Sequence, residues 1–571
     1  GSMQVTFTYH GPDLDSSIQA ELSAITVQIH TALAAMDSDW CLYFEAQRVP
    51  STRYPTQNYF PDSITWAMDQ ERKALFSNGS HFESKFYATL YWMPPPDTRE
   101  KVKEMLIEGR EHKEVRAEDT ISSFMEQVNK FYNTYTGLRI PIRLLTEDET
   151  LTYLHSIVSD RPRPLVMPKH PMLLDKYLYD TPFYGGLEPK LNHTHIRVVT
   201  PLKYMKMTEF GHLDVLNRLD FSYRWSTRCY TMSKQDTLSE LEKIRRKWYA
   251  KLQSIWSYII HNKEVDTERH NDKHITGLLD EIESARLAVE ADSFGYVYYT
   301  TAVIIEDEDQ EAADDKARIV YQVFTDNGFK AKIEDVNAVE GWLGSIPGLV
   351  GRNIRRELVS TANFVHLMPL SDIWAGNAWN KHLNGPPLLY TQTSGNTPFR
   401  LNLHVGQIGH TMLVGDTGAG KSVHLNCIDA AFRKYQNSRV IIFDNGKSSK
   451  VLTYGVGGKF YDLGEERGGA LSFQPLANID DARERQWAQE WLCDFLREEN
   501  VEITPRLKGL IRDALGILAD SPTHFRTITN FIDYLQDDTL KTAFAPLSQR
   551  DRSGNAGEYG NIFDSDHDTL K

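Results

Sequence analysis

The chain has 571 residues and a formal net charge of −15 at pH 7, a length that predicts about three or four core-forming units. This negative charge excludes a globally basic surface of the kind that binds nucleic acid, although a local basic groove stays open. The cysteines are far apart, without metal-ligand spacing, and indicate a reduced, cytosolic compartment; they are Cys41, Cys229, Cys427 and Cys493.

No apolar run approaches the ~20 residues that span a bilayer. The nearest candidate, GYVYYTTAVII from Gly295 to Ile305, stops at four consecutive acids. We therefore expect any contact with a membrane to be peripheral or through a partner.

Residues 1–200 alternate strand-like runs such as WCLYFEAQ, FYATLYWM and HIRVVTPL with helical stretches and proline-rich breaks. This alternation predicts a mixed α/β region. Within it, Asn78 fits the N-glycosylation pattern, but without a secretion signal the pattern has no use. His193 and His195 share a strand face and could hold a metal; with no third ligand in view, a pair of surface histidines is the preferred interpretation.

Apolar residues recur at three- and four-residue steps from Leu238 onward, behind a plausible cap at Asp236. This period predicts a long amphipathic helix. A second helix over about 276–289 completes a helical hairpin over about 236–290. Beyond it, YVYYTTAVII, a helix ending at Gly328 and KAKIEDV predict a strand, helix, strand unit.

The proline- and glycine-rich passage NGPPLLYTQTSGNTPF interrupts every periodic pattern. It places the main domain boundary here. We expect an N-terminal α/β domain over 1–384, a linker over 385–399 and a second domain over 400–571.

The second domain opens with GDTGAGKS, which fits G-x-x-x-x-G-K-[ST] in full between the strand-like HTMLV and the helix-like SVHLNCIDAAFRKY. Glycines let the backbone N–H groups wrap closely around phosphate oxygens, and the helix beginning near Lys421 adds its positive end. Lys421 would reach the β- and γ-phosphates and Ser422 would ligate Mg²⁺, so ATP and Mg²⁺ are the expected cofactors. The predicted nucleotide-binding residues are Gly415, Asp416, Thr417, Gly418, Ala419, Gly420, Lys421, Ser422 and Val423.

Two acidic stretches compete for the metal-binding role that such a site also needs. Asp444 follows the apolar run VIIF and is a weak metal candidate; the preferred alternative is a strand-end residue that shapes the neighbouring loop. The acids of AVIIEDED at 302–309 lie before the P-loop and are interpreted as a solvated strand end.

Four helical segments follow between about Asp480 and Gln549. They resemble an all-helical insertion, over about 480–550, in a nucleotide-binding sheet. Only GEYGNIFDSDHDTLK remains after them, so we expect the domain to be incomplete.

Several blocks of sequence carry a family resemblance. They are GWLGSIPGLVGRNIRRELVSTANFVHLMPLSDIWAG, the passage from NGPPLLY through GDTGAGKS, FDNGKSS, and the early YHGPDLDS and HFESKFYATLYWMPPPD. Together they resemble the TrbE branch of the conjugation and type IV secretion ATPases over nearly the whole chain.

This resemblance implies a RecA-like motor domain behind a family-specific N-terminal domain. It implies a homo-oligomer, hexameric in the complete protein, that lies peripherally on the bacterial inner membrane among other secretion components. The protein would hydrolyse ATP to power channel or pilus assembly and substrate transfer. The family's Walker B Asp-Glu and arginine finger have no match here, and we expect them beyond residue 571; the chain should therefore bind ATP and turn it over poorly.

Two alternatives remain open: a nucleotide-binding structural switch without turnover, and a DNA-pumping coupling-type ATPase. The latter is disfavoured by the absence of N-terminal membrane spans and of basic charge. Arg352, Arg355 and Arg356 form a basic cluster that could touch nucleic acid or an acidic neighbour, but a solvated face is the default interpretation.

Overall fold

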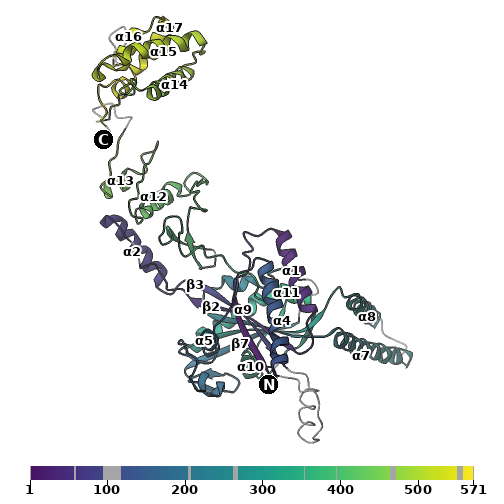
Figure 1. The fold of residues 1–571 in the computed structure, drawn as a ribbon. Coiled ribbons are helices and arrows are strands. Elements are labelled where there is room, and N and C mark those ends of the chain that lie inside the picture. Colours follow the sequence, from purple (N-terminus) through teal and green to yellow (C-terminus); the bar gives the residue numbers. More distant parts are fainter. Residues whose placement is uncertain are drawn as a thin grey trace. The chain divides into compact units, whose positions relative to one another are not determined.

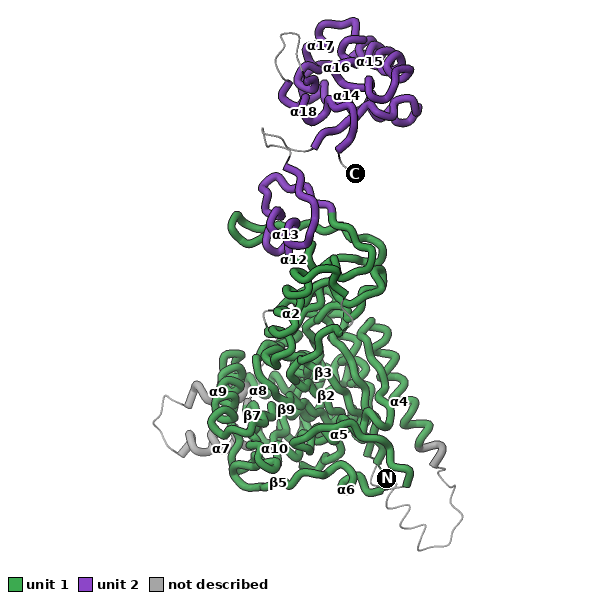
Figure 2. Tube along the Cα trace, turned by 90° about the vertical axis from the view of Figure 1, so that its left-hand side faces the viewer, with its two compact units in different colours: residues 1–421, 427–440 green, residues 422–426, 441–571 purple. Residues whose placement is uncertain are grey.

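The computed structural model describes residues 2–56, 59–93, 117–170, 172–203, 208–261, 268–352, 354–393, 395–462, 471–549 and 557–569. The chain divides into two compact units (Figures 1 and 2). Unit 1 comprises residues 1–421 and 427–440, and unit 2 comprises residues 422–426 and 441–571. Among the described residues, no helix is both long and apolar enough to cross a membrane.

Unit 1 is built on an antiparallel sheet with the strand order β4-β1-β3-β2-β8-β9-β7-β6-β5, in which β10 also pairs with β7 and β11 with β9. The strands are β1 (Met3–Tyr9), β2 (Trp40–Pro50), β3 (Phe82–Trp92), β4 (Ile142–Leu144), β5 (Phe183–Tyr184), β6 (Lys190–Leu191), β7 (Thr194–Lys203), β8 (Tyr223–Thr231), β9 (Tyr296–Asp307), β10 (Lys330–Ile333) and β11 (Glu357–Ser360). Successive side chains of a strand point to opposite faces of the sheet, so Phe86, Ala88 and Leu90 of β3 are buried on the same side. The mixed α/β class is therefore confirmed.

Unit 1 also contains helices, some packed on the two faces of this sheet and others extending away from it (Figure 1). They are α1 (Gln19–Ala34), α2 (Ser63–Ser77), α4 (Ala117–Gly137), α5 (Glu147–Val158), α6 (Leu174–Leu178), α7 (Lys234–His261), α8 (Glu268–Glu290), α9 (Gln310–Asp326), α10 (Ala338–Gly344) and α11 (Thr361–Leu367), with the short 3-10 helix η1 (Asp214–Arg218). The apolar sides of α1, α4, α9 and α11 share one large core with the sheet.

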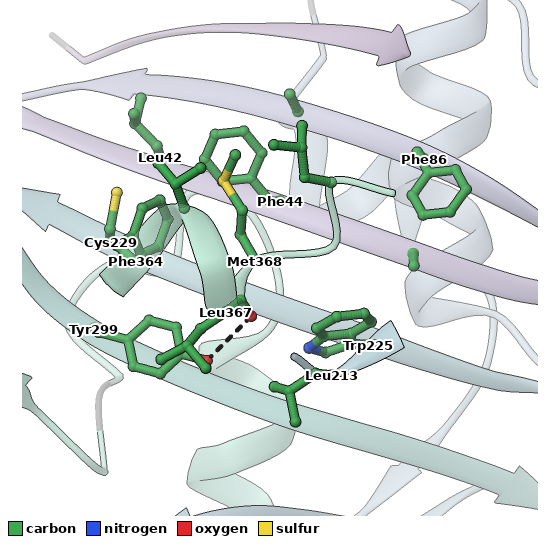
Figure 3. Close-up of a cluster of buried hydrophobic side chains, with 14 of the residues drawn as sticks. Leu42, Phe44, Phe86, Leu213, Trp225, Cys229, Tyr299, Phe364, Leu367 and Met368 are labelled. Carbon is green, nitrogen blue, oxygen red and sulfur yellow. Dashed lines mark hydrogen bonds between the residues drawn. The ribbon is translucent and has the colours of Figure 1, made fainter. Parts of the chain in front are cut away.

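The centre of that core is aromatic (Figure 3). The ring of Phe364 on α11 lies 5.8 Å from the rings of Phe44 and Tyr299, measured between centroids. The Tyr299 hydroxyl donates a hydrogen bond to the carbonyl oxygen of Leu367 at 3.4 Å, so even this polar group has a partner in the core.

The opposite face of the sheet carries buried charge. Arg224 on β8 donates to both carboxylate oxygens of Glu45 on β2, at 3.0 and 2.8 Å, and Glu45 is only 1% exposed. A bidentate pair of this kind gives both carboxylate oxygens of Glu45 a charged donor where water is excluded.

The strand, helix, strand unit predicted from the sequence is present as β9, α9 and β10. Asp309 caps α9 by accepting from the backbone N–H of Glu311, and Gly328 follows the helix with a φ of 81°, a conformation that favours glycine. Strands β9 and β10 both pair antiparallel with β7, which lies between them.

The predicted helical hairpin is also present as α7 and α8. Its cap differs from the prediction, because α7 begins at Lys234 and Asp236 lies within the first turn. The Asp236 carboxylate accepts hydrogen bonds from the hydroxyls of Ser38 and Ser233. The side chains of residues 250–276, which include part of the predicted apolar stripe, lie outside the described ones.

Residues 385–399, expected as a linker, instead belong to a packed β-hairpin of unit 1. Strands β12 (Leu389–Gln392) and β13 (Pro398–Leu401) pair antiparallel. Leu388 and Leu389 are 2% and 5% exposed. The proline- and glycine-rich composition therefore marks a hairpin here, and the division between units lies beyond Lys421 rather than at Asn384.

Unit 2 contains the four helices predicted between Asp480 and Gln549. They are α14 (Ala482–Glu498), α15 (Pro505–Ala519), α16 (Ile528–Tyr534) and α17 (Asp538–Phe544), and this unit also has α13 (Lys450–Gly455), α18 (Gly560–Phe563), η2 (Thr523–Phe525) and η3 (Ala545–Leu547). Each of the four begins at an Asp or Thr whose side chain accepts a backbone N–H. Their apolar sides form a core of their own.

Candidate nucleotide-binding site

The predicted P-loop, residues 415–422, leads directly into α12 (Lys421–Phe432). Gly418 and Gly420 have φ values of 85° and 86°, and Gly420 is the N-cap of the helix. A side chain at either position would be strained although space is open around both. The helix therefore begins where the motif predicts, and the glycines are required by the backbone.

The ammonium group of Lys421 folds back over this loop. It donates to the carbonyl oxygens of Gly415 and Asp416, both at 2.7 Å. The loop is tightened further by the N–H of Ala419, which donates to the carbonyl of Asp416 at 3.2 Å. These contacts hold a cation against the loop, where an anionic ligand would meet it.

The first turn of α12 adds exposed hydrogen-bond donors to those of the loop. Residues 411–420 are exposed, as are Ser422 and Val423. The first backbone N–H groups of an α-helix have no partner within the helix, and the helix dipole makes this end positive. Exposed N–H groups, a lysine and the Ser422 hydroxyl form a donor set that fits nucleotide phosphates with Mg²⁺.

Asp444, the weak metal candidate, is committed to its own turn. Its Oδ2 accepts from the backbone N–H and the hydroxyl of Ser449, both at 2.8 Å, and from the hydroxyl of Ser448 at 3.2 Å. Its Oδ1 accepts from the N–H of Gly446 at 2.9 Å. The hydrogen bonds from Ser449 lower the pKa of the Asp444 carboxyl. These contacts match the loop-shaping alternative, and a metal would have to displace some of them.

The strands expected on either side of α12 are not formed among the described residues. Residues 410–414 and 439–443 have no strand partners there. Met412 is 87% and Phe443 is 97% exposed. The apolar patterns are those of buried strands, but a strand is stable only beside neighbours that supply its hydrogen bonds. A RecA-like sheet remains a prediction.

Other candidates from the sequence have local explanations. His193 is exposed whereas His195 is only 7% exposed in β7, so the interpretation as two surface histidines is wrong for His195. No group of three or more metal-binding side chains occurs in the described part of the chain. The acids at 302–309 are not uniformly solvated: burial raises the pKa of Glu306, and Asp307 pairs with Lys316.

The basic cluster at 352–356 is satisfied within unit 1. Arg352 pairs with Glu340 and Arg355 with Glu334, both at 2.8 Å. The Arg356 guanidinium lies over the ring of Tyr230, 5.6 Å from its centroid. Arg352 and Arg356 are exposed, as the solvated-face interpretation predicts, and Arg355 is partly buried; ion pairs and a cation–π contact hold all three against unit 1.

No role was predicted from the sequence for the three residues that follow α12, which are Arg433, Lys434 and Tyr435. Together with their partners we call them the α12 anchor. Their side chains contact α2, its N-cap residue Asp62 and the segment 386–388 that leads into β12. A basic pair after an apolar helix is typical of a solvated C-terminal turn, so the composition carried no signal of this burial.

The whole chain is similar to proteins of one family. A family model described as type IV secretion system ATPase VirB4/TrbE, N-terminal domain, matches residues 1–100. The conjugal transfer protein TrbE of Rhizobium radiobacter is 30% identical over 595 residues, which cover 100% of this chain and 71% of that protein.

Two further relatives extend the likeness. A probable conjugal transfer protein TrbE of Sinorhizobium fredii is 31% identical over 434 residues, covering 75% of this chain and 64% of that one. The type IV secretion system protein virB4 of Bartonella henselae is 21% identical over 592 residues, covering 100% of this chain and 71% of that one.

Proposed function

Because the chain belongs to the TrbE-type branch of the VirB4/TrbE family of type IV secretion system ATPases, we propose that it binds Mg-ATP at residues 415–423. The observation that carries the proposal is the P-loop that opens α12, with its two left-handed glycines and its folded-back lysine. Bound nucleotide would supply the negatively charged phosphates that accept hydrogen bonds from these donors.

Each group of the loop has a separate task in this proposal. The N–H groups of Gly418, Gly420, Lys421, Ser422 and Val423 would bind the α- and β-phosphate oxygens, since they lie at or just before a helix start, whereas that of Ala419 donates to the Asp416 carbonyl. Lys421 would exchange its two carbonyl contacts for the β- and γ-phosphates, where its charge stabilises the developing negative charge. Ser422 would supply one oxygen ligand to Mg²⁺.

We propose that this chain binds ATP but hydrolyses it slowly. Phosphoryl transfer also needs an acid that positions water or holds the metal. Asp444 is the acid that the sequence offers next to the P-loop helix, and its oxygens are engaged by residues 446–449. A binding assay therefore tests the site more directly than turnover does.

For the whole protein we propose an energy subunit of a conjugation or type IV secretion system that powers channel or pilus assembly and substrate transfer. It would act as a homo-oligomer attached peripherally to the bacterial inner membrane by other components of the system. The names of the relatives, conjugal transfer and type IV secretion proteins, support this proposal. Turnover would separate it from a structural switch, and stimulation by DNA would favour a coupling-type ATPase.

The binding site is tested by titrating the purified chain with Mg-ATP and Mg-ADP in a calorimeter. Lys421→Ala removes the cation that faces the phosphates and should weaken affinity by more than about tenfold. Lys459→Ala, which removes an exposed lysine elsewhere, should leave affinity unchanged. Equal affinities of the original chain and the Lys421→Ala variant would refute the proposed site.

A further inference from the structure

The end of α12 opposite the P-loop is fixed by buried polar contacts. The Lys434 ammonium donates to the carbonyl oxygens of Leu388 at 2.8 Å and Pro387 at 3.2 Å. It also lies 4.0 Å from Oδ1 of Asp69 on α2. Both Lys434 and Asp69 are only 7% exposed, so these contacts form inside unit 1.

Neighbouring contacts complete the α12 anchor. Arg433 pairs with Asp62, the N-cap of α2, at 3.0 Å. The Tyr435 hydroxyl donates to the carbonyl of Pro386 at 2.7 Å. The anchor therefore ties the residues after α12 both to the start and middle of α2 and to the chain that enters the hairpin.

A buried lysine is a poor way to gain stability. Removing an ammonium from water costs several kcal/mol, which its partners offset only when the geometry is good. Burial accordingly lowers the pKa of Lys434 to about 8, against the opposing attraction of Asp69. The arrangement does fix a position: two carbonyl acceptors and the nearby Asp69 carboxylate hold the ammonium in one place, two residues beyond the end of α12.

Helix α12 transmits that position to the P-loop. It runs without interruption from Lys421 to Phe432, about 18 Å at 1.5 Å per residue. Its start is the phosphate-binding turn, so any tilt of the anchored end displaces the N–H groups at the other. Binding of a compact anion depends on such groups being placed in advance.

We propose that Lys434 is a positioning residue for nucleotide binding: with Asp69 and the carbonyls of residues 387–388, it lets the N-terminal part of the chain set the orientation of the P-loop helix. This inference rests on the proposed binding of nucleotide at residues 415–423. It assigns to α2 and the β12–β13 hairpin a role in the affinity of a site that neither element forms.

The test measures nucleotide affinity and thermal stability in the original chain and in three variants. Lys434→Met keeps the length of the side chain and removes its charge, so it should weaken Mg-ADP binding about five- to tenfold and lower the unfolding midpoint. Adding Asp69→Asn removes the buried negative charge that Lys434 balances and keeps an oxygen that can accept from the Tyr54 hydroxyl; this double variant should regain stability but not affinity. Lys73→Met, at an exposed lysine on α2, should change neither.

A purely structural role predicts a different pattern. In that case affinity would return together with the midpoint in the double variant, and the inference would be overturned. If Lys434→Met does not fold, Arg433→Gln breaks the more exposed contact to Asp62 and should still weaken binding about two- to threefold; an unchanged affinity there would count against the anchor. Failure of the original chain to bind Mg-ADP would refute the proposed function itself, whereas binding that is equal in the original chain and in Lys434→Met refutes only this inference.

Discussion

Several charged side chains are buried in this fold, and their removal from water lowers the stability of the folded state. Asp214, the first residue of η1, is an example: its Oδ2 accepts from the Ser371 hydroxyl, while its Oδ1 is buried without a partner among the described residues. Burial raises the pKa of its carboxyl to about 7, and the nearby Asp372 and Asp13 act in the same direction. The folded chain therefore retains a proton that an unfolded aspartate releases near pH 4.

This shift predicts a pH dependence of stability. Between about pH 4 and pH 7 the folded state binds more protons than the unfolded state, so the free energy of unfolding falls as pH rises, by up to about 1.4 kcal/mol per pH unit. Asp214→Asn removes the titration and should flatten this part of the profile. Urea unfolding at pH 5, 6 and 7 measures it.

The comparison uses a matched aspartate. Asp326→Asn changes an exposed carboxyl at the end of α9, and its profile should follow that of the original chain. Parallel profiles of Asp214→Asn and the original chain would show that burial of Asp214 does not control this dependence.

Some elements of the fold depend on contacts with residues that are distant in the sequence, and the β12–β13 hairpin is the clearest example. Arg48 on β2 is 1% exposed, and it donates to the carbonyl of Gly395 and, at 3.1 Å, to the hydroxyl of Thr397. It also binds the carbonyl of Leu219 at 3.0 Å. One buried guanidinium on a central strand thus holds the hairpin against the sheet.

Removing this guanidinium should release the hairpin. We expect thermolysin to cut the original chain slowly between residues 385 and 401, and Arg48→Met to speed that cleavage at least about fivefold, since two hydrogen bonds to a charged group are lost. Arg53→Met, at an exposed position nearby, should leave the rate unchanged. Mass spectrometry of early fragments gives the rates; preferential cutting of the original chain within 385–401 would restore the linker interpretation.

At the scale of the whole molecule, the two units have separate hydrophobic cores. Phe364 lies in the core of unit 1, and Leu492 of α14 lies in the core that α14 to α17 form in unit 2; both are 0% exposed. Within the described ranges, no side chain belongs to both clusters, so the cores can lose their packing independently.

This separation predicts two unfolding transitions in calorimetry. Leu492→Ala leaves a cavity and should destabilise the helices of unit 2 by about 2–5 kcal/mol, which lowers one transition only. Phe364→Ala should lower the other. If either substitution shifts both transitions equally, the units unfold as one.

The sequence by itself determined those features whose physics is local. The P-loop needs only suitable glycine torsions and a helix start. The four helices of unit 2 are predicted by their N-cap residues and by the spacing of their apolar residues. Likewise, the strand, helix, strand unit after Gly295 follows from a change of hydrophobic period within forty residues. Family membership also followed from the sequence, since it depends on extended similarity rather than on any contact.

Tertiary structure alone decided the roles that depend on distant partners. Pro and Gly at 385–399 fit a linker as well as a turn, and only the pairing of β12 with β13 and the reach of Arg48 select the hairpin. Lys434 has the composition of a solvated helix end, and its burial arises because Asp69, 365 residues earlier in the chain, lies beside it. Conversely, the apolar runs at 410–414 and 439–443 are strand-like in sequence but form no strand among the described residues, and most of their side chains are exposed, because a strand is stable only beside neighbouring strands.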